Sequence, residues 1–183
     1  MTFPQSKKDL ESIPKWYTLA TKSRHEKAAK EGLETKGFET YLPLRTVIKK
    51  WSDRKKKVEE PLFKGYVFVK MPYRERIPVL ETPGVVRVVM FNGRPGILHE
   101  LEIKTIQRLL DVNRNHGAKI EALEGIGVGD TVEVMNGPLT GLKGQYTEIK
   151  NEHRLVISID SIGKSLAVEV PVDYVRRVTK SVM

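Results

Sequence analysis

The segment of residues 61–71 (PLFKGYVFVKM) constrains the fold of this chain more than any other. Its apolar residues fall on both alternating faces, which predicts a β-strand that is covered on both sides. A single layer of helices covers only one face of a sheet. We therefore expect one face to pack on the domain's own helices and the other to meet a partner. Aromatic residues in a strand are more often core, so both interpretations stay open at this point.

The elements around this segment predict a mixed domain over residues 15–115. Their order, βαββαβα, is typical of an antiparallel sheet with flanking helices, an α+β fold. A capping box of Ser23 and Glu26 is expected to begin the first helix, and Gly37 to end it. The predicted strands are residues 15–21, 38–51, 61–71 and 85–91, and the later helices are residues 74–82 and 99–113. Residues 1–14 lack periodicity and predict a disordered lead.

The last third of the chain predicts a second domain of a different kind. Residues 116–127 carry little pattern and are interpreted as a linker. Residues 128–179 hold short β-patterned runs separated by turn signals such as Asn136-Gly137-Pro138. Five short strands in so little chain favour a small five-stranded β-barrel. These strands are residues 131–135, 144–150, 155–159, 165–170 and 175–178.

The positive charge is unevenly distributed along the chain. Residues 1–125 contain 25 Lys and Arg against 16 Asp and Glu, whereas residues 126–183 contain 7 of each. The whole excess of +9 therefore belongs to the first two thirds, which favours a polyanionic partner there. The neutral C-terminal part fits a protein partner better than nucleic acid.

Two basic clusters are candidates for nucleic-acid binding. Lys22, Arg24, His25 and Lys27 stand at the start of the first predicted helix, where backbone N–H groups and the helix dipole favour phosphate. A solvated helix start is the alternative. The second cluster flanks Trp51 and could bind nucleic acid or be a solvated hairpin tip. It includes Lys55, Lys56 and Lys57.

The sequence argues against an enzyme and against a cofactor or metal site. The chain has no cysteine, and its four histidines lie far apart without metal-ligand spacing. Residues 125–129 (GIGVG) match neither a P-loop nor a dinucleotide-binding motif. A missing secretory signal, the absence of a long apolar run and the lack of cysteine predict a cytoplasmic protein.

Both parts of the chain carry recognisable motifs. In the first part, residues 16–17 (WY), 61–69 (PLFKGYVFV) and 82–85 (TPGV) resemble the N-terminal domain of the NusG family. Residues 128–130 (VGD) and 136–144 (NGPLTGLKG) look like a KOW motif, which implies an SH3-like barrel. The resemblance covers residues 15–178. Lys64 departs from it, because the family usually has proline there.

The resemblance implies a transcription elongation factor. Members dock an apolar patch on the clamp coiled coil of the largest RNA polymerase subunit, and the matching residues are Phe63, Tyr66 and Phe68. The basic helix start would contact non-template DNA, or a nascent RNA hairpin as in the LoaP type. The KOW face would recruit a small-subunit ribosomal protein or the termination factor Rho. Its matching residues are Leu142, Ile162, Gly163 and Lys164.

Within the family, the chain is similar to the specialised RfaH, UpxY and LoaP types. The resemblance therefore implies suppressed pausing and antitermination on particular operons by a monomer. A rival interpretation is an RNA-binding or ribosome-associated module that uses the KOW barrel. It requires tight RNA binding by residues 126–183 alone, which their zero net charge disfavours.

Overall fold

The computed structural model describes residues 12–51, 54–124, 129–149 and 152–178. Within it the chain forms two compact units, each made of two separate stretches. The first unit consists of Met1–Pro43 and Phe63–Ile103, and the second of Leu44–Leu62 and Lys104–Met183. The predicted domain boundaries and the predicted disorder of residues 1–14 stay predictions, and residues 1–11 lie outside the described part.

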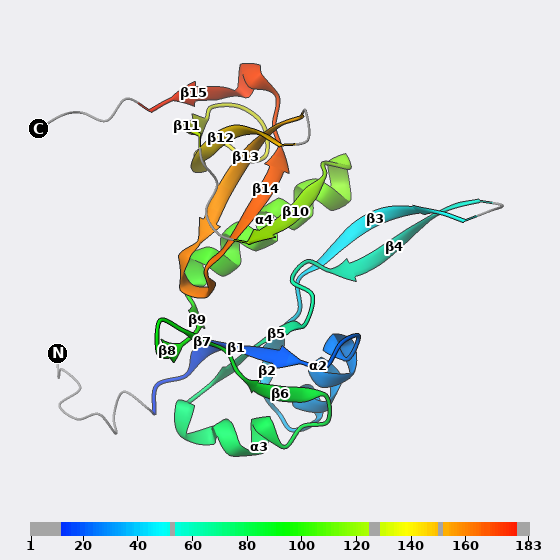
Figure 1. Ribbon diagram of the computed structural model, residues 1–183, viewed down its shortest axis with the longest axis vertical. Coiled ribbons are helices and arrows are strands. Elements are labelled where there is room, and N and C mark those ends of the chain that lie inside the picture. Colours follow the sequence, from blue (N-terminus) through cyan, green and yellow to red (C-terminus); the bar gives the residue numbers. More distant parts are fainter. Residues whose placement is uncertain (1–11, 52–53, 125–128, 150–151, 179–183) are drawn as a thin grey trace, which may run out of the picture. The chain divides into compact units, whose positions relative to one another are not determined.

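An antiparallel sheet forms the centre of the first unit (Figure 1). The sheet order is β2-β5-β1-β6, and the short strand β9 also pairs with β1. Its strands are β1 (Lys15–Thr21), β2 (Glu39–Tyr41), β5 (Tyr66–Met71), β6 (Val85–Val88) and β9 (Ile97–Leu98). Two further short strands, β7 (Met90–Phe91) and β8 (Arg94–Pro95), form a separate hairpin. The predicted α+β class with an N-terminal antiparallel sheet is confirmed.

The helices lie close to the expected ranges. Helix α2 (Glu26–Thr35) buries Ala29 and Leu33, and Gly37 follows it with a φ of 84°. A 3-10 turn, η1 (Tyr73–Glu75), leads into α3 (Arg76–Leu80), which buries Val79. The last helix, α4 (Glu100–His116), belongs mostly to the second unit and extends beyond the predicted end at residue 113.

The predicted capping box of α2 is wrong. His25 is the N-cap residue, and no side chain makes a capping hydrogen bond. Arg24 adopts a φ of 62°, a left-handed turn that separates Ser23 from the helix. The carboxylate of Glu26 instead accepts a hydrogen bond from the backbone N–H of Gly65 at 2.7 Å, and Glu26 is only 7% exposed.

We expect Glu26→Ala to lower the free energy of unfolding by about 1–2 kcal/mol, because the Gly65 N–H would lose its acceptor. Urea denaturation measures the change. The matched control is Glu31→Ala, since Glu31 is an exposed carboxylate on the same helix. Equal stability of the two variants would show that the contact between Glu26 and Gly65 does not support the fold.

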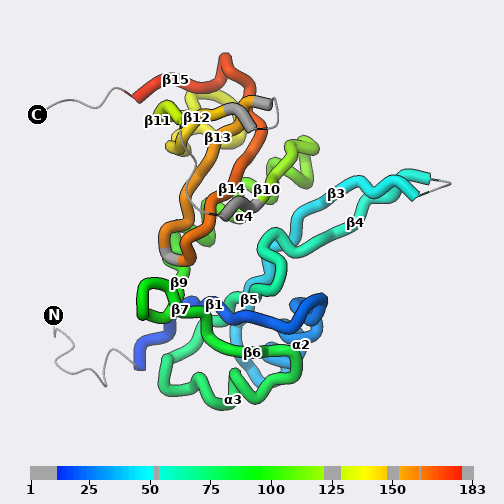
Figure 2. The backbone as a smooth tube through the Cα atoms, viewed as in Figure 1, coloured from blue at the N-terminus to red at the C-terminus, as the bar shows by residue number. Residues whose placement is uncertain are grey.

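The apolar segment 61–71 is not one continuous strand. Strand β4 (Lys55–Pro61) ends at the first residue of this segment, and β5 starts only at Tyr66. Between them the chain turns through Gly65, whose φ of 77° is a conformation that glycine favours. Strand β4 pairs with β3 (Leu44–Lys50) as an antiparallel hairpin, which the tube in Figure 2 traces in cyan.

A six-stranded antiparallel sheet forms most of the second unit, in the order β10-β14-β13-β12-β11-β15. All five predicted strands are present. They are β11 (Asp130–Val134), β12 (Lys143–Ile149), β13 (Glu152–Ile159), β14 (Lys164–Glu169) and β15 (Val175–Arg177). The sixth, β10 (Ile120–Glu124), lies in the range predicted as a linker, where it pairs with β14. Its five residues (IEALE) do not alternate strictly between apolar and polar, so they give no strand signal beside the glycines that follow.

Two glycines allow close backbone approaches in this sheet. A Cβ at Gly144 would lie 2.5 Å from the carbonyl oxygen of Val156, and one at Gly129 would lie 2.5 Å from that of Tyr146. Both glycines therefore serve packing between neighbouring strands rather than a special φ. Among the described residues, no helix has the length and apolar character needed to cross a membrane.

Candidate functional site

The three aromatic residues expected to dock on a partner differ in exposure. Phe63 is 3% exposed and Phe68 is fully buried, whereas Tyr66 is half-buried. The rings of Phe63 and Phe68 meet edge to face at a centroid distance of 5.9 Å, and Tyr41 stacks on Phe68 at 6.2 Å. Phe63 and Phe68 belong to the core of the first unit, which favours the core interpretation for these two residues, and docking by the three residues stays a prediction.

The strand register explains why Tyr66 differs from Phe68. The two residues lie on the same face of β5, because side chains two apart in a strand point the same way. Phe68 pairs with Thr18 and Tyr41 in the middle of the sheet. Tyr66 pairs with Ala20, where β1 approaches its end. The position of Tyr66 at the end of the strand leaves part of its side chain accessible.

The basic residues at the start of α2 are all exposed. These residues are Lys22, Arg24, His25 and Lys27. Backbone hydrogen bonds attach their loop to two neighbouring turns of the same unit: Lys22 N–H donates to Gly84 O, and Thr21 N–H donates to Gly65 O, each at 2.8 Å. His25 Nδ1 lies 2.9 Å from Ser23 O.

Lys64 joins this group, although no pattern in the sequence indicated a binding role for it. It is exposed and precedes Gly65, whose backbone bonds to both Thr21 and Glu26. The only sequence signal was its departure from the proline usual in the family. We call Lys22, Arg24, His25, Lys27 and Lys64 the basic corner. Tyr66 follows Gly65 directly, so a half-buried aromatic residue begins β5 next to the turn that carries Lys64 and bonds to the loop of Lys22.

Lys55, Lys56 and Lys57 lie in β4 and are all exposed. Each pairs across the hairpin, with Lys50, Lys49 and Ile48 respectively. Lys49 forms an ion pair with Glu60, so part of the positive charge is balanced. Trp51 is 60% exposed at the end of β3, and residues 52–53 lie outside the described part.

The residues expected to recruit a partner lie at one end of the C-terminal sheet. Leu142 precedes β12, Ile162 and Gly163 lie between β13 and β14, and Lys164 is the first residue of β14. Alternate connections of an antiparallel meander lie at the same end, so the two sets share that end. Ile162 is 5% exposed and packs as core, whereas Leu142 and Lys164 are half-buried.

The loop before β12 also contacts α4 within the second unit. Arg108 Nη2 donates to the carbonyl oxygens of Pro138 and Thr140, each at 3.0 Å. Leu139 between them is 4% exposed.

The pKa of Tyr146 in β12 is raised, mainly by burial and to a smaller extent by the nearby Asp173. Its hydroxyl lies 3.0 Å from Val170 O. The Tyr146 hydroxyl therefore stays protonated and can donate to that carbonyl.

Among the described residues, no group of three or more His, Asp or Glu side chains could hold a metal ion. The lowered pKa of Glu34 has a local cause: hydrogen bonds from Lys30 and then Thr40 stabilise its carboxylate. Neither observation indicates a reacting centre, and the candidate site consists of surfaces.

The fold and these surfaces together define an α+β protein with two larger antiparallel sheets and candidate binding surfaces for partners. A family model described as transcription termination factor nusG matches residues 14–107. The chain is 30% identical over 178 residues to the transcription termination/antitermination protein NusG of Streptococcus pyogenes serotype M1, covering 88% of this chain and 95% of that protein. It is 28% identical over 170 residues to the NusG of Lactococcus lactis, covering 85% and 88%.

A solved structure is also similar. It is described as domain interaction in Thermotoga maritima NusG, and it shares 26% identity with a TM-score of 0.56 over 92% of this chain and 99% of that one. The chain belongs to the NusG family of transcription termination/antitermination factors. This membership confirms the resemblance inferred from the motifs.

Proposed function

We propose that this protein binds RNA polymerase during elongation, suppresses pausing and promotes antitermination on specific operons. The observation that supports this most directly is that the half-buried Tyr66 begins β5 one residue after Gly65, whose backbone bonds to the loop that leads into the basic corner. A partly exposed aromatic residue provides an anchor for a protein partner. The neighbouring cations provide attraction for the nucleic acid that accompanies a transcribing polymerase.

Each part of the chain has a role in this proposal. The first unit contacts the clamp coiled coil of the largest polymerase subunit through Tyr66, with Phe63 and Phe68 supporting it from the core. The basic corner contacts non-template DNA or a nascent RNA hairpin. The C-terminal sheet recruits a small-subunit ribosomal protein or Rho at the end that carries Leu142 and Lys164. The protein acts as a cytoplasmic monomer and catalyses no reaction.

We expect Tyr66→Ala to weaken binding to RNA polymerase about tenfold, the loss typical of truncating one aromatic anchor. Titration of fluorescently labelled protein with core polymerase measures this. The matched control is Tyr73→Ala, because Tyr73 is another half-buried tyrosine of the first unit, packed against Tyr17 instead. Unchanged binding by Tyr66→Ala would remove this residue from the interface.

Transcription in vitro tests the activity itself. Wild-type protein is expected to increase read-through at a pause and at a terminator, and Tyr66→Ala is expected to reduce that increase. Read-through by the Tyr66→Ala variant equal to that of the wild type would contradict the proposed docking mode. Comparing a general template with one from a candidate operon then tests the specific-operon part of the proposal.

A further inference from the structure

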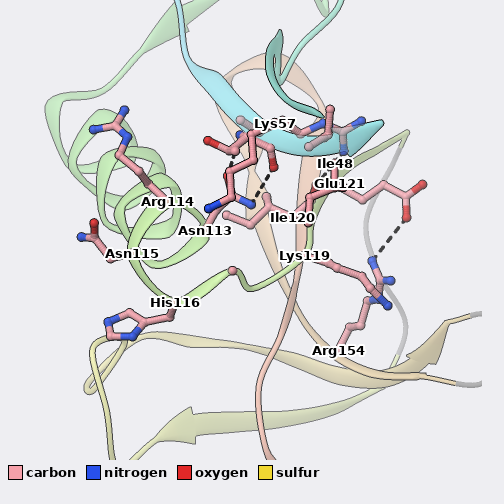
Figure 3. Close-up of a pocket in the computed structure, with 14 residues that line it drawn as sticks. Ile48, Lys57, Asn113, Arg114, Asn115, His116, Lys119, Ile120, Glu121 and Arg154 are labelled. Atoms are coloured by element: carbon pink, nitrogen blue, oxygen red, sulfur yellow. Dashed lines mark hydrogen bonds and ion pairs between the residues drawn. The ribbon is translucent and has the colours of Figure 1, made fainter. Parts of the chain in front are cut away.

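A basic cavity of about 700 Å³ lies within the second unit, between the β3–β4 hairpin, the end of α4 and the start of β10 (Figure 3). Its charged lining comprises Arg45, Lys57, Arg114, Lys119, Arg154 and Glu121. Five cations therefore face one carboxylate, with His116 also in the lining. The volume is in the range of sites that bind small ligands. Apart from Lys57, the charged residues of this lining belong to none of the motifs or surfaces described above.

Asn113 holds the cavity in shape. Its Oδ1 accepts from Thr46 N–H at 2.7 Å, and its Nδ2 donates to Thr46 O at 3.2 Å and to Ala118 O at 2.8 Å. The carboxamide thus pairs with the edge of β3 as a neighbouring strand would. Arg45 Nη1 donates a further bond to Ile120 O at 2.6 Å. These bonds connect the hairpin, the helix end and β10, so the wall of the cavity is ordered before any ligand binds.

The electrostatics of the cavity favour an anion. Arg154 is 5% exposed, and Glu121 lies 3.3 Å from its Nη1 (Figure 3). Lys57 and Arg114 are exposed, and within the described part of the chain neither side chain forms a hydrogen bond or ion pair. At the C-terminal end of α4, one of the last helical carbonyls is satisfied, because Asn113 O accepts from Gly117 N–H. An anion entering the cavity would balance the remaining positive charge.

We propose that this cavity binds a backbone phosphate of single-stranded nucleic acid. Lys57 belongs both to the cavity and to the basic run of the hairpin, so the cavity is the inner end of a row of cations. A flexible single strand can bend a phosphate inward, whereas a stiff duplex cannot enter a recess of this size. Trp51, 60% exposed further along the hairpin, offers a stacking surface for a base of the same strand. The inference deepens the nucleic-acid part of the proposed function and rests on it.

The test uses the full chain with fluorescent oligo(dT) and oligo(rU) of about 12 nucleotides, the size that such grooves accommodate. Binding is measured by anisotropy over a series of salt concentrations. Lys57→Gln combined with Arg114→Gln is expected to reduce the magnitude of the salt slope by about 0.7, the value of one lost phosphate contact on a single strand. The oligonucleotide whose salt slope decreases more in this variant identifies DNA or RNA as the natural ligand.

The control is Lys104→Gln, an exposed lysine of α4 outside the cavity, combined with Arg176→Gln, an exposed arginine of β15, so the charge change is equal. Lys57→Arg is expected to retain the wild-type slope. A cavity variant that binds no differently from the control overturns the phosphate site and leaves polymerase binding by Tyr66 untouched. A wild-type protein that binds neither strand overturns both this site and the nucleic-acid part of the proposed function.

Discussion

Phe68→Ala is expected to lower the free energy of unfolding by about 4 kcal/mol, because it truncates a large side chain in the core of the first unit. The side chain is fully buried and contacts the rings of Phe63 and Tyr41. Truncation leaves a cavity in the middle of the sheet that neighbouring strands cannot fill without losing their register. Urea denaturation followed by tryptophan fluorescence measures the loss, because Trp16 is buried in the same unit.

Phe91→Ala is the matched control, since Phe91 is a phenylalanine of the same unit that is 38% exposed. We expect its effect to stay within about 0.5 kcal/mol. A small effect of Phe68→Ala would mean that its ring is not core and would restore Phe68 as a direct contact for a partner. Loss of polymerase binding by Phe68→Ala is otherwise a consequence of unfolding, which is why Tyr66 is the more informative position.

Asn113→Ala is expected to destabilise the second unit by about 3 kcal/mol, from three lost hydrogen bonds at about 1 kcal/mol each. The residue is 7% exposed, and its side chain makes these three bonds with backbone groups. Removing it leaves the N–H and C=O of Thr46 and the C=O of Ala118 without these partners. Denaturation followed by circular dichroism measures the loss in the free energy of unfolding. Hydrogen exchange at the Thr46 amide reports local opening of the hairpin.

Asn115→Ala is the control for this prediction, because Asn115 is an exposed asparagine of the same helix turn. Asn113→Asp retains the acceptor for Thr46 N–H but cannot donate to the two carbonyls, so we expect an intermediate or larger loss. If Asn113→Ala is as stable as Asn115→Ala, the hairpin is held to α4 by other contacts. The ordered wall of the phosphate site would then lack its support.

Elements with strong local signals were predictable. Strands β11 to β15 follow from β-patterned runs bounded by glycine, proline and asparagine, because turn residues and alternation act over a few positions. Gly37 ends α2 as expected, with a φ that glycine tolerates best. The predictions that failed involve long-range partners. Glu26 bonds to Gly65 rather than capping its own helix, and β10 is a strand because β14 pairs with it.

The residues of the candidate sites also fall into those that the sequence predicted and those that it did not. The exposure of Lys22, Arg24, His25 and Lys27 follows from their charge, because isolated lysines and arginines are rarely buried. The cavity of Arg45, Arg114 and Arg154 could not be foreseen, since its residues come from segments far apart in the chain. No local pattern distinguishes these arginines from others on the surface.

The sequence by itself determined the family of this protein, its α+β class and the position of its positive charge, because motifs, alternation and charge are properties of neighbouring residues. Only the tertiary structure decided that Phe63 and Phe68 are core while Tyr66 reaches the surface. The three aromatic residues carry the same signal in the sequence. Their exposure depends on the place of each residue in the sheet and on which distant residues pack against it.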